Sequence, residues 1–278
     1  MQSLRDQYPE ESQEALLGLT LSEAFPSSTL LQEINKSWIN EVTLLDLLTH
    51  RSGLPDYIGA FEQKPNNPER LNKPIDSVDI LQKISFNSSK PYLYSNRNYF
   101  LLGKFIEEMH NASYEEVFES MVKDPAHMTS SYAPSKGNYY TLKELDKFQE
   151  LKADLNQKIF IDFANVGGAG GIISTSIDLT KWNDYLHHKI DNELKNILLK
   201  TYGEDQDGDR INLGLSTSKT NIGDLVGFQG HLDSYHSFLG FFPDQNRTII
   251  ILSNNDNDYE KIFDDAVMNG LIEPRNEL

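Results

Sequence analysis

The chain has 278 residues, of which 38% are hydrophobic and 24% are charged, a balance typical of a soluble globular protein with a sizeable core. It carries 42 acidic and 25 basic residues, and the net charge of -17 argues against nucleic acid as a partner because phosphate backbones would be repelled. The absence of cysteine excludes disulfides, zinc–thiolate sites and cysteine catalysis. No apolar run approaches the roughly 18 residues that a membrane span needs, so no span is predicted.

The first quarter of the chain predicts short helices. The opening residues lack a basic stretch followed by an apolar one, so no signal peptide is visible. Apolar residues within 1–24 recur at helix-compatible spacing, interrupted at Pro9, which is typical of the end of a helix. Residues 44–48 predict a short buried helix with Thr43 as its N-cap, and the apolar stripe within 78–84 predicts another.

The middle of the chain predicts longer amphipathic helices. Apolar residues recur at helical spacing over 99–109, and a second helix is expected from about Tyr114 to Val122. The glycine-rich run 167–171 allows backbones to approach closely, and either Ser176 or Asp178 is a suitable cap for the helix that follows.

The last quarter predicts a sheet and a covering helix. Four strands are expected, roughly at 211–217, 224–230, 235–242 and 248–253, and their short connections favour antiparallel neighbours. A final helix over 259–271 would cover one side of this sheet. Without repeats or linkers, these elements predict one α+β domain over 1–278, with a helical subdomain at roughly 25–200 and the sheet with its helix at roughly 205–272.

Four segments in this order resemble the serine β-lactamase and penicillin-binding-protein family, which includes class C β-lactamases, DD-peptidases and related esterases. The segments are residues 42–54 with Thr49-His50-Arg51-Ser52-Gly53, the triplet Tyr94-Ser95-Asn96 before a helix, Gly170-Gly171 through Leu179, and the strand end around 227–237. A single triplet carries little information, whereas the ordered set is specific and spans residues 25–270. The resemblance implies an antiparallel sheet flanked by helices, with a helical subdomain.

The family's first motif, Ser-x-x-Lys, is not found where the resemblance requires it. In such enzymes the lysine takes the proton of the nucleophilic serine one helical turn away. Counting back from His50 places this motif just upstream of Met1, so we expect the N-terminal strands and the start of the nucleophile helix to be missing. Two other matches, Ser120 to Lys123 and Ser216 to Lys219, come after the segments that they should precede.

Tyr94-Ser95-Asn96 matches the family's second motif, Tyr-x-Asn. The resemblance makes Tyr94 and Asn96 catalytic, with the phenol helping to move the serine proton and the amide holding the substrate carbonyl region or the lysine, and it places Ser95 at the substrate site. A free tyrosine has a pKa of about 10, so base catalysis at neutral pH needs nearby positive charge.

The third motif usually has a lysine or histidine, a small or polar residue, and glycine at the edge of a strand. Aligning its tail with Ser234 to Ser237 places Phe228-Gln229-Gly230 at the motif, and Phe228 supplies no cation. A rival register makes His231 the functional residue but puts Asp233 where glycine belongs. In the first register the resemblance makes the backbone N–H of His231 one oxyanion donor.

No metal site and no cofactor is predicted. The histidines lack a ligand spacing, and the acidic run Asp205, Asp207 and Asp209 lacks the downstream glutamate of a calcium loop. The resemblance implies a small-molecule or peptide substrate, namely a β-lactam, a cell-wall peptide or an ester, and a periplasmic or secreted protein.

Two functions compete. The first is a serine hydrolase whose nucleophile motif lies outside this chain, and whose activity is weak because Phe228 leaves Tyr94 with one cation fewer than usual. The second is a non-catalytic module that binds cell-wall peptides or another ligand. In either case a sheet without its N-terminal strands would leave a bare edge, which predicts self-association.

Overall fold

The structure of the protein is a computed structural model. This structure describes residues 4, 8–57, 81, 84–133, 166–232, 235–253 and 259–263. Within these ranges no helix combines the length and the apolar character needed to cross a membrane.

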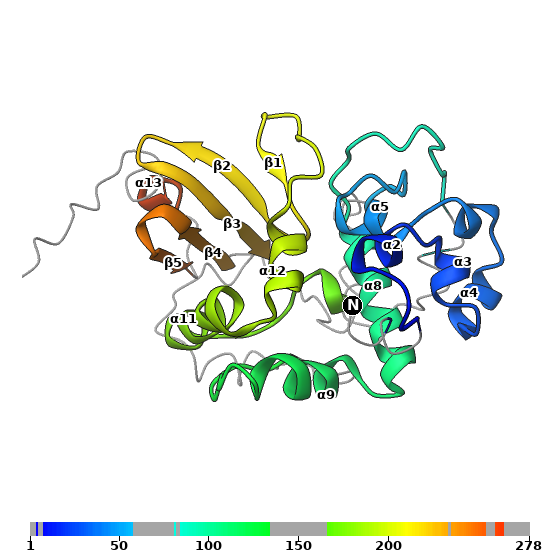
Figure 1. Cartoon of the computed structure of the whole chain (residues 1–278), viewed down its shortest axis with the longest axis horizontal. Helices are drawn as coiled ribbons and strands as arrows, with labels where there is room; N and C mark the ends of the chain where they lie inside the picture. Colours follow the sequence, from blue (N-terminus) through cyan, green and yellow to red (C-terminus); the bar gives the residue numbers. More distant parts are fainter. Residues whose placement is uncertain are drawn as a thin grey trace, which may run out of the picture.

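All α-helices except α13 precede the strands along the chain (Figure 1). The α-helices are α2 (Gln13–Leu17), α3 (Leu21–Ala24), α4 (Thr29–Ile34), α5 (Leu44–Leu48), α8 (Asn96–His110), α9 (Tyr114–Phe118), α11 (Ser176–Asp184), α12 (Asn192–Leu199) and α13 (Tyr259–Phe263). Short 3₁₀ segments are η1 (Ser37–Asn40), η7 (Gly167–Ala169) and η9 (Pro243–Gln245), and π-helical turns are η3 (Glu119–Lys123) and η8 (Tyr185–Lys189). The strands are β1 (Arg210–Ile211), β2 (Ser216–Thr220), β3 (Gly223–Leu232), β4 (Tyr235–Phe242) and β5 (Arg247–Ser253).

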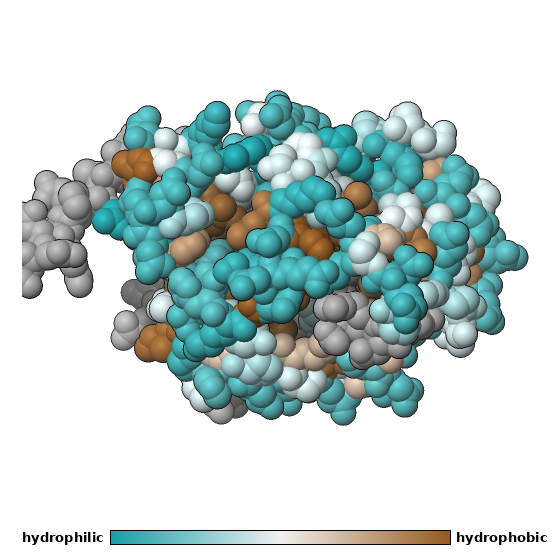
Figure 2. Space-filling model, viewed as in Figure 1, coloured by the Kyte–Doolittle hydropathy of each residue, from teal (hydrophilic) through white to brown (hydrophobic). Residues whose placement is uncertain are grey.

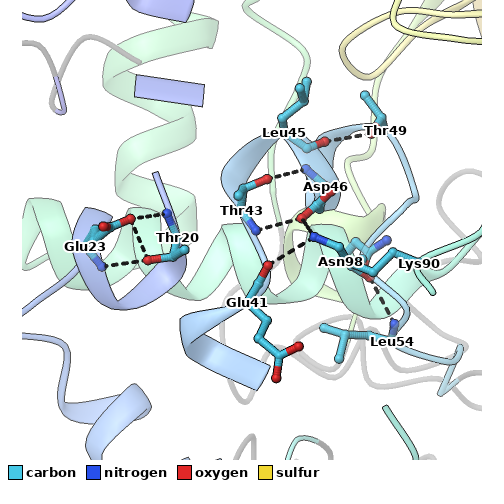
Figure 3. Close-up of polar contacts among 11 residues, drawn as sticks. Thr20, Glu23, Glu41, Thr43, Leu45, Asp46, Thr49, Leu54, Lys90 and Asn98 are labelled. Carbon is cyan, nitrogen blue, oxygen red and sulfur yellow. Dashed lines mark hydrogen bonds and ion pairs between the residues drawn. The ribbon is translucent and has the colours of Figure 1, made fainter. Parts of the chain in front are cut away.

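The short N-terminal helices are fixed by capping and by one shared core. Thr20 and Thr43 each accept a backbone N–H three residues on, while Glu23 and Asp46 return a carboxylate to the cap's own N–H (Figure 3). The helix predicted after Thr43 is therefore confirmed, with its cap. Fully buried side chains of these helices pack against α8 in a cluster that includes Leu16, Leu21, Val42, Leu47, Phe100, Leu101 and Phe105.

The long helix α8 carries the apolar periodicity that the sequence shows. Its inner face is buried at Phe100, Leu101 and Phe105, so the predicted helix over 99–109 is confirmed and begins three residues earlier. The next predicted helix exists as α9, which continues from Glu119 as the π-helical turn η3.

The five strands form one antiparallel sheet in the order β1-β2-β3-β4-β5. In Figure 1 the sheet lies on the opposite side of the molecule from α2 to α5, and α11 lies beneath it. Because side chains alternate along a strand, Leu225 and Phe238 share one face, which packs against Phe263 of α13. The other face meets α11 and η8, where Asn183 donates to Thr248.

Two expected details are wrong. The strand expected over 211–217 is split into β1 and β2, because the chain turns at Gly214, whose φ is +73°. Two residues earlier, the side-chain amide of Asn212 donates hydrogen bonds to the carbonyl oxygens at the end of α12. The helix after the glycine run is capped by Thr175 rather than by Ser176 or Asp178, since its hydroxyl accepts the N–H of Asp178.

The helical part and the sheet meet through a small apolar contact. Leu17 of α2, Ile197 of α12 and Leu213 before β2 are buried together. Figure 2 shows hydrophobic residues gathered near the middle of the view and at the left edge, with hydrophilic residues over most of the remaining surface. Most of the helix predicted over 78–84, and the final helix beyond Phe263, lie outside the described residues.

Candidate active site

The predicted second motif lies in the turn that starts α8. Ser95 is the N-cap residue of α8, and Asn96 is the first residue of the helix. Tyr94 is 43% exposed, whereas Ser95 is completely buried, so the Ser95 side chain offers no surface to a ligand. Its hydroxyl finds no hydrogen-bond partner.

His50 holds this turn from beneath. Its Nδ1 accepts the backbone N–H of Ser95 at 3.1 Å, and its carbonyl oxygen accepts the N–H of Leu93 at 2.9 Å. The proton of the neutral ring therefore resides on Nε2, an assignment that follows from the hydrogen bond. The ring packs 4.4 Å from the ring of Tyr94 and 5.2 Å from that of Tyr99. Burial lowers the pKa of His50 to about 4, so the ring is uncharged at neutral pH.

A buried polar chain ties the Ser-Gly-Leu segment to the same helix. The hydroxyl of Ser52 donates to Asn98 Oδ1 at 2.6 Å and accepts the N–H of Leu54 at 3.1 Å. Asn98 Nδ2 lies 3.4 Å from His50 Nδ1. Ser52 and Asn98 are at most 1% exposed, so these contacts fix one motif against the other away from water.

Asp56 orients Asn96. Its Oδ1 accepts the backbone N–H of Asn96 at 3.1 Å, and its Oδ2 accepts Asn96 Nδ2 at 3.0 Å. One N–H of the Asn96 amide is thereby engaged, and its Oδ1 accepts the hydroxyl of Tyr94 over 3.4 Å. Sequence reasoning missed both His50 and Asp56, although both lie in or just after the Thr-His-Arg-Ser-Gly segment, whose proximity to the triplet was the available signal.

Replacing Asp56 by alanine is expected to lower the free energy of unfolding by about 1–3 kcal/mol, because the Asn96 N–H and amide lose their acceptor and the start of α8 loses a favourable negative charge. Urea unfolding at pH 7 measures this. Asp56→Asn is the matched control, since it keeps an oxygen acceptor and should lose less. Equal losses in the two variants would contradict the argument.

The surroundings of Tyr94 favour the neutral phenol. Burial is the largest cause that raises its pKa, and Asp56 and Tyr92 raise the pKa further. No cation counters them among the described residues that act on this pKa. Tyr94 therefore keeps its proton at neutral pH and is suited to donate a hydrogen bond or a proton rather than to remove one.

Of the two registers for the third motif, Phe228 is the residue that faces the triplet. Its ring lies 6.2 Å from the ring of Tyr94 at an interplanar angle of 21°. His231 is three positions further along β3 and so points to the opposite face, where its ring stacks 4.3 Å from that of His236. Gln229 and Gly230 are exposed, and a Cβ on Gly230 would lie 2.6 Å from Ser237 Oγ.

Neither internal Ser-x-x-Lys match builds a serine–lysine pair. In η3 the hydroxyl of Ser120 donates to a backbone carbonyl and Lys123 pairs with Glu119. In β2, Ser216 and Lys219 are three residues apart and point to opposite faces. No group of three metal-ligating side chains occurs in the part of the chain that the structure describes.

The family model described as Beta-lactamase matches residues 18–268. The chain belongs to the beta-lactamase family. The expected resemblance to serine β-lactamases and penicillin-binding proteins is thereby confirmed, and so is the α+β fold of an antiparallel sheet with flanking helices.

Known relatives of this beta-lactamase-family domain agree with the assignment. Penicillin-binding protein 4* of Bacillus subtilis is 24% identical over 255 residues, which cover 82% of this chain and 54% of that protein. A D-stereospecific amidohydrolase from Streptomyces sp. has the same fold, with a TM-score of 0.73 at 17% identity over 96% of this chain and 82% of that one. A class C beta-lactamase gives a TM-score of 0.69 at 15% identity, covering 99% and 79%. The chain thus spans about half the length of the curated relatives that it matches.

Proposed function

We propose that residues 1–278 are a single acyl-transfer hydrolase domain of the serine type whose activity is weakened. Its substrate would be a β-lactam, a D-Ala-D-Ala-like peptide, or a small amide or ester. The names of the similar proteins, a penicillin-binding protein and an amidohydrolase, support this range. Tyr94 and Asn96 are the proposed catalytic residues, and Phe228 with Gln229 and Gly230 is the proposed third-motif segment.

One observation supports a weakened hydrolase activity. The ring beside Tyr94 on the sheet is that of Phe228, and the ring beneath it is the neutral imidazole of His50. Without a cation to favour the phenolate, Tyr94 is a poor base for a serine hydroxyl. Removal of the serine proton, which begins acylation, should therefore be slow.

The test is covalent labelling of the native gene product with a fluorescent penicillin and with an activated phenyl ester. Mass spectrometry should find one acylated serine, and Tyr94→Phe should slow its acylation further. Labelling that is absent under all conditions would support the second candidate, a binding-only module, which the loss of the cation at Phe228 favours. An acylation rate unaffected by Tyr94→Phe would contradict the role of the phenol.

We also propose that the chain associates with itself through β5. Among the described strands β5 pairs only with β4, and its run from Thr248 to Leu252 carries no charge or proline that would block a further strand. Leu252 is 43% exposed.

We expect a concentration-dependent dimer of this chain in light scattering coupled to gel filtration. Leu252→Lys should shift the equilibrium to monomer, because a lysine on an edge strand opposes pairing. The matched control is Met121→Lys, which changes an equally exposed residue in η3, away from the sheet. A monodisperse monomer of the unaltered chain at high concentration would refute the proposal.

A further inference from the structure

Two histidines face each other where β3 ends and β4 begins. His231 and His236 are directly opposed in the register of these strands, and their rings stack with centres 4.3 Å apart at an interplanar angle of 8°. Side chains at opposed positions of an antiparallel pair start from Cβ atoms about 4.5–5.5 Å apart, so both can contact one ligand. The register of the strands, rather than a spacing in the sequence, brings the two imidazoles together.

The ring of His236 is held from its other side. Tyr259 of α13 stacks on it with ring centres 4.6 Å apart, and Tyr259 is itself buried and donates its hydroxyl to the carbonyl oxygen of Ser237 at 3.3 Å. His236 is half-buried, whereas His231 is exposed. One imidazole is therefore fixed by packing, and the other is free to tilt at the surface, so little ordering is left for a ligand to impose.

Two neighbouring imidazoles are suited to a transition metal. Neutral imidazole is a common ligand of Zn²⁺ and Cu²⁺, whereas Mg²⁺ and Ca²⁺ require oxygen ligands. Two nitrogens bound to one tetrahedral Zn²⁺ lie about 3.3 Å apart. The edges of the two rings must therefore close by about 1 Å from the stacked separation, which a tilt of the exposed His231 ring provides. The net charge of -17 also attracts cations to the chain.

We propose that His231 and His236 bind one divalent transition-metal ion, Zn²⁺ or Cu²⁺, with water completing its coordination. Because side chains alternate along β3, the ion would lie on the opposite face of the sheet from Phe228 and Tyr94. It would join the end of β3 to the start of β4 without contacting the candidate active site. This two-ligand site does not conflict with the lack of a three-ligand group within the described ranges, and it does not rest on the proposed hydrolase function.

The test is a titration of the 278-residue chain, freed of any affinity tag, with Zn²⁺ at pH 7.5 in competition with a chromophoric chelator. One ion should bind per chain with a Kd on the order of 10 μM, because two imidazoles supply half of the four ligands of a structural zinc site. An excess of Mg²⁺ should not displace it. In NMR spectra, substoichiometric Cu²⁺ should broaden the ring signals of His231 and His236 before those of other histidines.

Single variants locate the site. His231→Asn and His236→Asn should each weaken Zn²⁺ binding at least about tenfold. The matched control is His127→Asn, which removes another exposed histidine at a φ of +56° that asparagine tolerates, and its Zn²⁺ binding should be unchanged. Because His231 is exposed, His231→Asn should fold even if His236→Asn does not, and circular dichroism checks this.

Three results would each overturn the proposal. The first is the absence of saturable Zn²⁺ binding below millimolar concentration. The second is an affinity that is unchanged in His231→Asn. The third is an equal loss of affinity in His127→Asn and His231→Asn.

Discussion

Acidification from pH 7 to pH 5 is expected to lower the free energy of unfolding by about 2 kcal/mol through His50 alone. The pKa of His50 is about 4 in the folded chain because burial disfavours the imidazolium, and about 6.5 is usual for an unfolded one. The unfolded chain therefore binds more protons in this window, so stability is fully present above pH 6.5 and is lost as the pH falls toward 4. His187, whose pKa burial also lowers to about 4, acts with the same sign.

Urea unfolding at pH 7, 6 and 5 measures the effect in a range where most carboxylates stay ionised. The control is His50→Asn, because the Oδ1 of asparagine can take the place of Nδ1 as acceptor for the Ser95 N–H, and asparagine tolerates the φ of +55° at this position. This variant should be less stable at pH 7, since it loses the ring contacts with Tyr94 and Tyr99, yet it should show a shallower dependence on pH. If the free energy of unfolding of His50→Asn depended on pH as steeply as that of the unaltered chain, His50 would not be the source of the pH dependence.

Local patterns in the sequence were sufficient wherever one short stretch determines the structure. The spacing of Phe100, Leu101 and Phe105 predicts the buried face of α8, and Thr43 before the apolar run 44–48 predicts the N-cap of α5. The split of β1 from β2 was missed, because the conformation of Gly214 is coupled to Asn212, which bonds to the end of α12. A single hydrogen bond between two elements produces no repeating pattern in the sequence of either element, so the sequence alone does not predict it.

In the candidate site, too, features within one short stretch are predicted, whereas contacts between distant stretches are not. The order of the motifs in the sequence predicts the triplet at Tyr94, but His50 and Asp56, which hold it in place, are more than 35 residues away along the chain. The positions of His50 and Asp56 in the sequence follow no pattern from which their hydrogen-bond partners could be predicted. The sequence places Phe228 at the third motif and allows His231 as a rival, and the alternation of side chains along β3 puts these two residues on opposite faces, with Phe228 toward Tyr94.

Glycine at position 168 is expected to be needed for the helix that carries the site. A Cβ on Gly168 would lie 2.4 Å from the carbonyl oxygen of Tyr99 and 3.0 Å from the backbone of Gly103, so η7 and α8 touch backbone to backbone. Backbone atoms cannot move aside as a flexible side chain can, and Gly168→Ala should lower the free energy of unfolding by about 2–3 kcal/mol. Gly103→Ala meets the same contact, at 2.7 Å from Gly168 N, but should cost less because alanine favours a helix interior by about 1 kcal/mol.

The matched control for Gly168→Ala is Gly18→Ala. Gly18 ends α2 with a φ of -79°, and a Cβ there meets nothing closer than 3.4 Å, so its stability should change by no more than about 0.5 kcal/mol. Urea unfolding separates the two variants. Because Tyr99 lies in the first turn of α8, three residues after Asn96, the displacement that relieves Gly168→Ala should also move Asn96 from Asp56. Labelling of the native gene product by the activated phenyl ester should then slow in Gly168→Ala and stay unchanged in Gly18→Ala, whereas a loss of stability without slower labelling would show that the glycine contact supports the fold but does not position the site.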